Sequence, residues 1–498
     1  MLETKVTGMT KARLLAAGLL VAGFAPGQAI DPLRYSVATP RPVNPAEGTT
    51  NPSAQATQRQ NPYLGSLPQK STGANIDISL NDAVERGLRY NLGLVDAGHA
   101  SADVRAARLR ALSAMLPQIT GRGRQAYEDL SLKEIGLRLP PIPGFRGLPA
   151  TTGGFGFEDA RVSVEQSVFS ARLRNQYRAQ KTEEQASTFD VKDSRDVVVL
   201  AVGTAYLQAL ASEARVEAAK ARLASARELD RQTADRVRAE TAPEIDALRA
   251  RVERQTAKQA VTDAANRLEK DKLTLGRIIG FDVDQPFTLT DTLAWHPLTG
   301  MTAESATSDA LHTRADLASA DVSLRAAELK LKAEKAQRLP TVSFNANYGA
   351  GGANLGNMNR VYAIEGDVSI PLYTGGRIRA DIEQAQTELE RRQAAYDDLR
   401  GRVAYDVRIA WLDAQASESS VKVAEQNRAL ADRALAQSHD RYENGVTNAL
   451  EVVQAQEAVA LAADNYIDSV YSFDLATVSL ARAMGGADTK LKGLLGGK

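Results

Sequence analysis

The 498-residue sequence contains no cysteine and few aromatic residues. Without cysteine the chain can form no disulfide, use no thiol nucleophile, hold no zinc through thiolates and carry no lipid on an N-terminal cysteine. Aromatic residues make up 5% of the chain, which is little for several compact cores, because aromatic side chains supply much of the buried area of a core. The charge is balanced, with 61 Lys and Arg against 61 Asp and Glu, so no nucleic-acid surface is indicated.

The first 29 residues are predicted to be a secretory signal peptide. Lys5, Lys11 and Arg13 form a basic start, a 12-residue apolar run follows at 14–25, and residues 27–29 form a small-residue cleavage site. The run is too short to span a hydrocarbon core of ~30 Å as a helix; a buried N-terminal helix is the alternative. No later stretch reaches the roughly 18 uninterrupted apolar residues of a transmembrane helix, so any membrane crossing is expected to use strands.

Residues 30–75 are predicted to form a Pro-rich N-terminal extension. The segment is polar and contains seven prolines, which lack a backbone donor and break helices. No apolar residue recurs with a period, as is typical of segments without a core of their own. A flexible or surface-lying leader is therefore expected, and a proline-rich ligand for a partner is the less favoured alternative.

From residue 76 onward the sequence consists of two similar halves. A helical stretch from Leu80 to Leu116 ends in Leu-Pro, and so does a second from about Ser305 to Leu339, at an offset of 340 − 117 = 223. After the strand regions that follow, the offset is 373 − 169 = 204, so the first half has about 19 extra residues between its strands. The expected divisions are a first repeat at 76–284, a linker at 285–304, a second repeat at 305–487 and a C-terminal tail at 488–498.

Two very long helical runs follow the strand region of each half. They cover about 171–239 and 377–443, break at a turn, and resume to Gly280 and Gly485. A run of about 69 residues is on the order of 100 Å long. Residues of the first run recur at spacings of three and four, as in a coiled-coil seam: Val202, Ala205, Ala209, Ser212, Val216, Ala219, Leu223 and Ala226. An ordinary helical spacer is the alternative.

The segments between the helices alternate apolar and polar residues. Residues 341–348 and 364–372 alternate clearly, and residues 162–167 more weakly, while the glycines at 349–352 are expected to form a hairpin loop. Strands of ~9–11 residues with one apolar face are typical of outer-membrane barrels; half-buried soluble hairpins are the alternative. Four strands per chain cannot close a barrel, since lipid offers no partner for a sheet edge. The chain is therefore expected to oligomerise, with eight strands from two copies or twelve from three.

The chain resembles the TolC-like outer-membrane efflux protein family over roughly residues 76–487. The motifs that carry the resemblance are Leu80-Asn-Asp-Ala83, Leu116-Pro117, Arg314-Ala-Asp-Leu317, Leu339-Pro340, Tyr373-Thr-Gly-Gly-Arg377, Tyr442-Glu-Asn-Gly445 and Leu450-Glu-Val-Val453. The resemblance implies a mainly α fold with a membrane β-barrel portion. Long coiled-coil hairpins would form a trimeric α-barrel across the periplasm, and four strands per chain would contribute to a 12-stranded outer-membrane barrel. The missing cysteine corresponds to the unlipidated members.

The resemblance also implies a function and partners. Such proteins are homotrimers in outer-membrane lipid that serve as the exit duct of a tripartite efflux pump or of a type I secretion system. A periplasmic adaptor docks on their helical tips and links them to an inner-membrane pump or ABC exporter. The tips here would be the turns at 239–243 and 444–448, with six docking residues: Glu240, Thr241, Ala242, Asn444, Gly445 and Val446.

A gate at the periplasmic mouth is implied in the same way. Glu451 occupies a position of the family's acidic ring, Tyr442 a latch position, and Asp246 that of the carboxylate to which the Tyr442 hydroxyl would donate. Gln454 and Thr447 replace a second ring carboxylate and a latch arginine, so a leakier gate is expected. A solvated helix face is the alternative role for Asp246 and Glu451.

No catalytic or cofactor-binding pattern is found in the sequence. The four histidines, His99, His296, His312 and His439, are scattered without metal-ligand spacing, and neither a nucleophile elbow nor a P-loop is present. We therefore expect no enzyme, no cofactor and no nucleic-acid partner. The competing function is a periplasmic coiled-coil adaptor or structural spacer, which would have one helical hairpin instead of two matched hairpins with strands.

Overall fold

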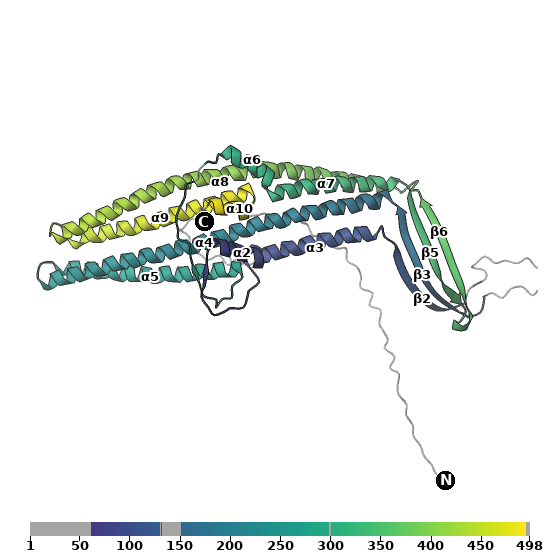
Figure 1. Cartoon of the computed structure of the whole chain (residues 1–498), viewed down its shortest axis with the longest axis horizontal. Helices are drawn as coiled ribbons and strands as arrows, with labels where there is room; N and C mark the ends of the chain where they lie inside the picture. The colour runs from purple at the N-terminus through teal and green to yellow at the C-terminus, as the bar shows by residue number, and fades with distance from the viewer. Residues whose placement is uncertain (1–60, 130, 132–150, 298–299, 495–498) are drawn as a thin grey trace, which may run out of the picture. The chain divides into compact units, whose positions relative to one another are not determined.

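The computed structural model describes residues 61–129, 131, 151–297 and 300–494 (Figure 1). The predicted signal peptide at 1–29 and most of the Pro-rich extension lie outside the described residues. The end of that extension lies against the helices: the Tyr63 hydroxyl donates to Ser194 Oγ at 3.2 Å, and the Leu67 N–H donates to the Tyr90 carbonyl at 2.9 Å. Gly93 makes this contact possible, because a Cβ there would lie 2.3 Å from the Tyr63 ring.

The elements follow the same order in both halves. A short helix and a longer helix lead into two long strands, and two long helices follow. In the first half these are α2 (Leu80–Tyr90), α3 (Leu92–Ser113), β2 (Gln118–Glu128), β3 (Phe155–Phe169), α4 (Ala171–Arg238) and α5 (Glu244–Ile279). In the second half they are α6 (Ala303–Thr313), α7 (Ala315–Lys335), β5 (Thr341–Gly352), β6 (Met358–Ser369), α8 (Arg377–Glu443) and α9 (Ala449–Met484).

Shorter elements complete the described part of the chain. They are the 3-10 turns η1 (Pro62–Leu64), η2 (Ala336–Arg338) and η3 (Leu355–Asn357), the strands β1 (Ile76–Ile78) and β4 (Phe287–Leu289), and helix α10 (Ala487–Leu494). β1 and β4 pair in parallel, so the segment expected to be a linker contributes a strand. The expected C-terminal tail begins within α10.

Each predicted first helix is in fact two helices. Asn91 and Arg314 have extended backbone angles, with ψ of 131° and 124°, and each separates a short helix from a longer one. The Asn91 side chain accepts from Gly93 N at 2.9 Å and so caps α3. The prediction of an uninterrupted helix was wrong because side-chain contacts with other segments hold these two residues out of the helical conformation.

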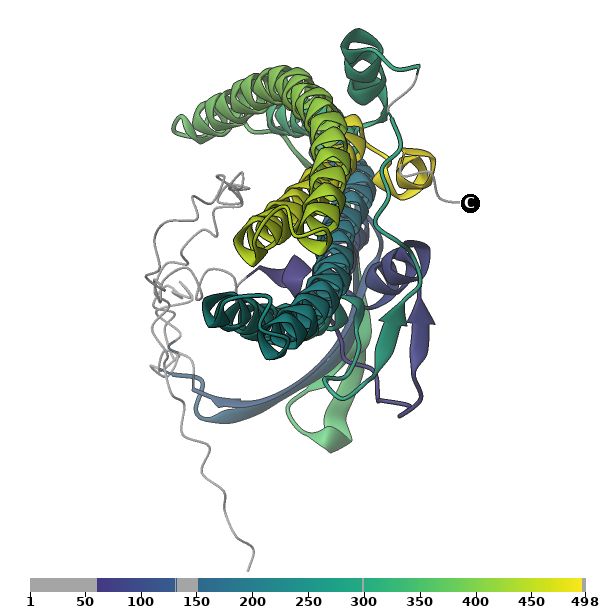
Figure 2. The same ribbon diagram turned by 90° about the vertical axis from the view of Figure 1, so that its left-hand side faces the viewer.

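The long helices confirm the predicted hairpins. α4 has 68 residues and α8 has 67, and they lie beside α5 and α9 respectively (Figures 1 and 2). The Ser170 hydroxyl caps α4, and Gly280 ends α5 in a left-handed conformation with φ of 83°, which costs glycine little. Six seam residues are buried: Val202, Ala209, Ser212, Val216, Leu223 and Ala226.

One described helix, α4, is long and apolar enough to span a membrane by length and composition. In that 18-residue window 61% of the residues are buried within the chain, among them Val198, Val202, Tyr206 and Leu210, which belong to the largest apolar cluster. The window is therefore a core segment packed against other elements.

Four strands form one antiparallel sheet in the order β2-β3-β5-β6. Its register places apolar residues in rows across the sheet: Ile119 pairs with Val164, Val164 with Ala346, and Ala346 with Ile364. The adjacent row on the opposite face is polar, with Gln118, Glu165, Asn345 and Glu365 paired in turn. Among the described residues β2 and β6 pair with no further strand, so the sheet has two open edges.

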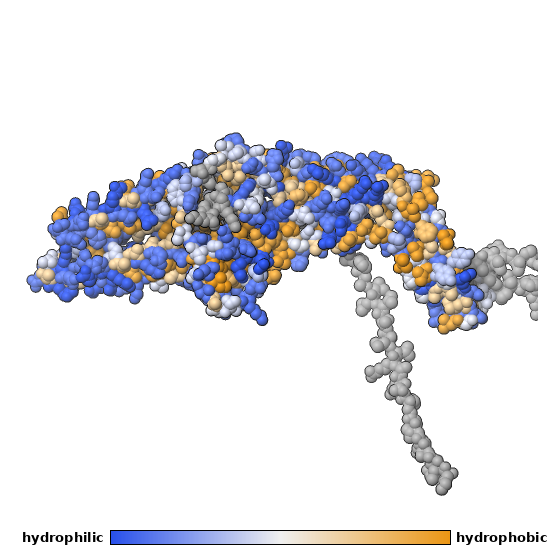
Figure 3. Space-filling view, viewed as in Figure 1, coloured by the Kyte–Doolittle hydropathy of each residue, from blue (hydrophilic) through white to orange (hydrophobic). Residues whose placement is uncertain are grey.

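The apolar face of this sheet is exposed in the single chain. Ile119 is 69% exposed, Ile364 71% and Tyr362 68%, and Figure 3 shows apolar surface over the strands. The glycines at 349–352, predicted to form a hairpin loop, lie instead inside β5. Gly349 is required there because a Cβ would lie 2.1 Å from the Ala160 carbonyl oxygen on β3, which is the close backbone approach that glycine permits in a strand.

A buried ionic network joins the helices where the chain returns to its C-terminus. Arg314, 7% exposed, pairs with Asp316 at 2.5 Å and Asp406 at 3.3 Å. Arg482 pairs with Asp193 at 2.6 Å, and Asp196 accepts from Gly486 N at 3.0 Å and Ala487 N at 2.8 Å. Burial would raise the pKa of Asp316, but the Arg314 guanidinium holds it below its ordinary value. The network fixes α10 against α4.

Candidate functional site

The two helical tips have the same backbone geometry at an offset of 205. Thr241 N donates to Arg236 O at 2.9 Å and Val446 N to Arg441 O at 2.8 Å, and 446 − 241 equals 441 − 236. The turn residues Glu240 and Gly445 also correspond, and both have left-handed backbones, with φ of 55° and 70°. Glu240 is the non-glycine residue with positive φ in the described part of the chain. The tip whose sequence lacks the usual glycine therefore makes the same turn.

Tyr442 lies at the contact between the two hairpins. It is 2% exposed and packs in a cluster with Leu229 of α4, Ala250 of α5, and Ala449 and Val452 of α9. Burial raises the pKa of the Tyr442 phenol, and the Arg236 guanidinium opposes that rise. The side chain predicted to be a latch is therefore a packing centre between the hairpins.

The predicted hydrogen bond between Tyr442 and Asp246 is absent. Among the described residues the Tyr442 hydroxyl has no hydrogen-bond partner, and the buried Asp246 carboxylate lies 3.5 Å from Arg249 Nη1 instead. The negative charge of Asp246 contributes to the raised pKa of Tyr442. The two side chains are neighbours, but their contact in the single chain is not the proposed bond.

Arg236 links the two hairpins, and the sequence analysis did not identify it. Its Nη1 donates to the Tyr442 carbonyl oxygen at 2.8 Å, and its Nη2 donates to the Glu443 carbonyl oxygen at 3.0 Å. The guanidinium carbon lies 4.2 Å from the centroid of the Tyr442 ring. A cation is favourable at a helix C-terminus, where carbonyl groups lack helical donors. We call this set of contacts the Arg236 clasp.

Glu451 is half-exposed and paired within its own hairpin. Its Oε1 lies 3.1 Å from Arg441 Nε, and the Thr447 hydroxyl donates to the carboxylate. Thr447, which the resemblance places where the family would have a latch arginine, contacts the Glu451 carboxylate, the predicted member of the acidic ring. The negative charge expected at this level of the mouth is thus partly compensated by Arg441.

The sequence contained a signal for both arginines. Asp235-Arg236 and Asp440-Arg441 match at 440 − 235 = 205. The pair was visible as a repeat correspondence, but nothing in the sequence indicated that Arg236 reaches the other hairpin while Arg441 stays on its own.

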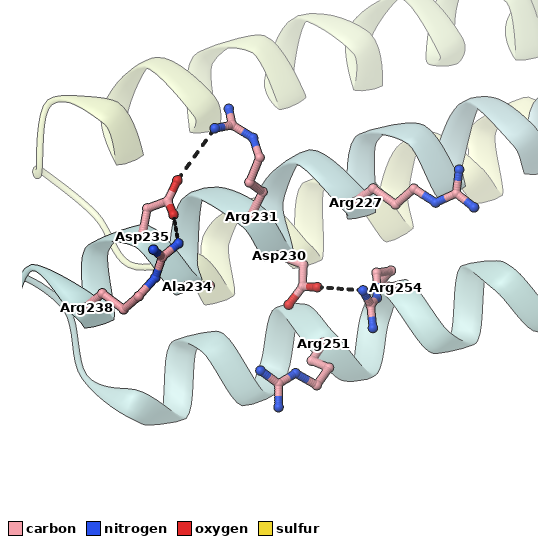
Figure 4. A pocket seen from close by; sticks show the side chains of 8 residues that line it. All are labelled: Arg227, Asp230, Arg231, Ala234, Asp235, Arg238, Arg251 and Arg254. Carbon is pink, nitrogen blue, oxygen red and sulfur yellow. Dashed lines mark hydrogen bonds and ion pairs between the residues drawn. The ribbon is translucent and has the colours of Figure 1, made fainter.

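An arginine-rich cleft of about 430 Å³ lies between α4 and α5 near their tip (Figure 4). Its lining residues are Arg227, Asp230, Arg231, Ala234, Asp235, Arg238, Arg251 and Arg254. Arg254 pairs with Asp230 at 3.1 Å and Arg231 with Asp235 at 3.5 Å, whereas Arg227 and Arg251 have no ion-pair partner within the described ranges. The cleft therefore retains positive charge.

In the second hairpin, the positions that correspond to the five arginines of this cleft carry no arginine. At the offset of 205, Arg227 and Arg238 correspond to Asp432 and Glu443, since 432 − 227 and 443 − 238 both equal 205. Arg231, Arg251 and Arg254 correspond to Ala436, Gln456 and Val459. The two tips share a backbone but present opposite charge beside it.

Comparison with protein families and relatives agrees with this architecture. A family model described as outer membrane efflux protein matches residues 306–486. Outer membrane efflux protein BepC of Brucella suis is 24% identical over 424 residues, which are 84% of this chain and 86% of that protein. Outer membrane protein OprJ of Pseudomonas aeruginosa is 29% identical over 187 residues, 36% of this chain, and the match spans 38% of OprJ.

Solved structures show the same fold. The Campylobacter jejuni CmeC outer membrane channel superposes with a TM-score of 0.69 at 18% identity, covering 86% of this chain and 92% of that one. The outer-membrane channel OprN superposes with a TM-score of 0.67 at 19% identity, covering 82% of this chain and 90% of that one. The resemblance indicated by the sequence is confirmed: residues 306–486 match the outer membrane efflux protein family model, and most of the chain is similar to outer-membrane efflux proteins and channels.

Proposed function

We propose that three copies of this chain form a closed outer-membrane channel that continues into a helical tunnel across the periplasm. Three four-stranded sheets would give twelve strands, and two hairpins per chain would give twelve long helices. The internal repeat, with matching element order and tip geometry in the two halves, supports a nearly regular ring of six hairpins. α4, with 68 residues, would extend on the order of 100 Å.

The observation that carries this proposal is the exposed apolar face of a sheet with two open edges. In a soluble protein, apolar residues such as Ile119 and Ile364 would be covered, and unpaired strand edges would be protected. In a membrane the apolar face would contact lipid, while the edges must pair because lipid offers no hydrogen bonds. Pairing β2 of one copy with β6 of the next meets both requirements.

The duct would serve a tripartite efflux pump or a type I secretion system. We propose that a periplasmic adaptor docks on the two tips, Glu240, Thr241 and Ala242 on one and Asn444, Gly445 and Val446 on the other, and links the duct to an inner-membrane pump or ABC exporter. Because the arginine-rich cleft accompanies the first tip alone, adaptor copies would meet two chemically different sites around the ring.

The channel is the shared feature among relatives, while the cargo named for them differs. Relatives include a pyoverdine export outer membrane protein, OpmQ of Pseudomonas aeruginosa, and a toluene efflux pump outer membrane protein, TtgF of Pseudomonas putida, which are 24% and 23% identical to this chain.

The signal peptide at 1–29 would export the chain, and the extension at 30–75 would precede the channel body.

The gate would lie at the hairpin tips. Glu451, which Arg441 partly compensates in the single chain, would narrow the mouth, and the contacts of Tyr442 and Asp246 would hold the hairpins together. The Arg236 clasp supplies the hydrogen bonds that were expected from the Tyr442 hydroxyl. Opening would then require an interaction that competes with the clasp.

Reconstitution in a planar lipid bilayer tests this function. The purified, detergent-extracted protein should produce discrete single-channel conductance steps, and it should fractionate with outer membranes in cells. A periplasmic spacer or adaptor would remain in the soluble fraction and leave the bilayer electrically silent.

A further inference from the structure

The repeat makes Arg441 the counterpart of Arg236, but the single chain gives the two residues different partners. The two arginines occupy the same place in their tips, because the backbone carbonyl oxygen of each accepts a hydrogen bond from the N–H of the residue five positions later, Thr241 or Val446. The Arg236 guanidinium crosses to the other hairpin and donates to the carbonyl oxygens of Tyr442 and Glu443. Arg441 pairs with Glu451 on its own hairpin, because no further hairpin lies beside α8 in one chain.

We propose that, in the assembled duct, Arg441 makes the same clasp with the next copy of the chain. The positions that correspond to Tyr442 and Glu443 are 442 − 205 = 237 and 443 − 205 = 238. Arg441 of one copy therefore donates to the carbonyl oxygens of Val237 and Arg238 at the end of α4 in the next copy. This inference rests on the proposed ring of copies. It assigns Arg441 as the residue that joins neighbouring copies at the helical tips.

The acceptor end of α4 is suited to this contact. No backbone N–H of the described residues donates to the Arg238 carbonyl, as expected for the last residue of a helix. The Val237 carbonyl accepts from Glu240 N at 3.0 Å, just as the Tyr442 carbonyl accepts from Gly445 N at 3.1 Å while also accepting from Arg236. A guanidinium can therefore add to Val237 and Arg238 as it does to Tyr442 and Glu443.

The outer edge of α5 exposes a stripe of apolar residues, and the repeat relates their positions to positions on α9. Ile245, Leu248 and Val252 are 49%, 47% and 66% exposed. Subtracting 205 from Leu450, Val453 and Glu457 gives these three positions. Val453 packs in the Tyr442 cluster, which joins the two hairpins. Leu248, the counterpart of Val453, therefore occupies an interface position for which the described single chain has no partner.

The outer edge of α8 is exposed in the same way. Val423 and Leu430 are 57% and 55% exposed. Leu430 corresponds to Ser225, since 430 − 225 = 205, and Ser225 accepts from Gln456 of α9 at 2.8 Å within the chain. The counterpart of Gln456 is Arg251 of α5. The in-chain contact of α4 with α9 thus predicts an inter-copy contact of α8 with α5, and Arg441 lies at its tip end.

Paired cysteines test the clasp directly, because the chain has none of its own. The test variant is Arg441→Cys with Arg238→Cys, and the matched reference is Arg236→Cys with Glu443→Cys. After treatment with a short bismaleimide, the reference should cross-link within one chain and keep the monomer mass on a denaturing gel. The test variant should give a ladder that ends at three chains, whereas each single-cysteine variant should remain a monomer.

The outcomes separate the clasp from the proposed function. A trimer by native mass that gives no ladder overturns the clasp and leaves the trimeric duct intact. A monomer by native mass overturns both. A ladder from the test variant in a native trimer supports both.

A second measurement distinguishes two roles of Arg441: a contact between copies, or only the ion pair with Glu451 within one chain. If Arg441 holds two copies together, Arg441→Ala should lower the temperature at which the trimer separates into chains, Arg441→Lys should lower it less, and Glu451→Gln should leave it unchanged. Equal effects of Arg441→Ala and Glu451→Gln would contradict the clasp.

Discussion

Arg236 joins the two hairpin tips through its guanidinium group. It donates two hydrogen bonds to the last carbonyls of α8 and stacks on Tyr442, and bonds that involve a charged group contribute about 1.5–3 kcal/mol. We expect Arg236→Ala to raise single-channel conductance. Tyr442→Phe should leave conductance unchanged, because the hydroxyl has no partner within the described residues. Larger conductance for Tyr442→Phe than for Arg236→Ala would contradict this assignment.

Glu240 holds a backbone conformation that suits glycine. Its φ of 55° costs an L-residue roughly 1–2 kcal/mol. Glu240→Gly should therefore raise the unfolding temperature measured by circular dichroism, and Thr241→Gly, at an ordinary backbone position, should not.

At the equivalent Gly445, a bulky β-branched residue should abolish pump function without removing the protein from the membrane.

Asp474 on α9 makes stability depend on pH. It is 4% exposed, and burial raises the pKa of its carboxyl from 3.8 to about 7. A carboxyl whose pKa is raised by folding favours the folded state when protonated, so its contribution is present below pH about 4 and is lost as the pH rises through about 7.

We therefore expect Asp474→Asn to raise the unfolding temperature at pH 8 more than at pH 5. The difference between the wild type and this variant isolates Asp474 from other carboxyls, such as Asp316, whose pKa is lowered. An unfolding-temperature difference that is the same at both pH values would show that Asp474 does not titrate in this range.

At the scale of elements, the periodicity of apolar residues in the sequence predicted the long helices, because local patterns determine where such helices begin and end. The limits of α4, α5, α8 and α9 agree with the sequence, because the seam of α4 recurs at helical spacing and the turns after α4 and α8 contain residues that break helices. Strands β3, β5 and β6 were predicted from their alternation, whereas no alternation was identified in β2, and the register of the sheet places Ile119 of β2 in one row with Val164, Ala346 and Ile364.

What the sequence left unpredicted depends on contacts between distant segments. Asn91 interrupts a helical pattern because it caps α3 and its amide donates to the Tyr63 carbonyl at 2.8 Å. The glycines of β5 suggested a loop, but the approach of β3 requires Gly349. The Arg236 clasp joins residues 206 positions apart, and a local pattern cannot show which of two matched arginines crosses between hairpins.

Two neighbouring residues of β6 test the assignment of the sheet faces. Ile364 lies on the apolar face and Glu365 on the polar face. Arginine on a lipid-facing strand position costs about 2–4 kcal/mol near the membrane centre, so Ile364→Arg should reduce the amount of folded protein in outer membranes. Glu365→Arg should insert normally and shift ion selectivity toward anions. Normal insertion of Ile364→Arg with failure of Glu365→Arg would reverse the two faces.

At the scale of the whole molecule, one chain leaves several surfaces without partners. The sheet has open edges at β2 and β6, and the outer edges of the hairpins expose Leu248, Val252, Val423 and Leu430. In the proposed ring, each of these surfaces would find its counterpart on another copy, strand edge to strand edge and α8 to α5. A ring of copies would satisfy the sheet and the hairpins together.

Native mass spectrometry of the detergent-extracted protein tests this central claim most directly. Four strands and two hairpins per chain should close as a ring of three, so the protein should have the mass of three chains and separate into single chains only on denaturation. A particle of one or two chains would contradict the twelve-stranded barrel and the twelve-helix tunnel.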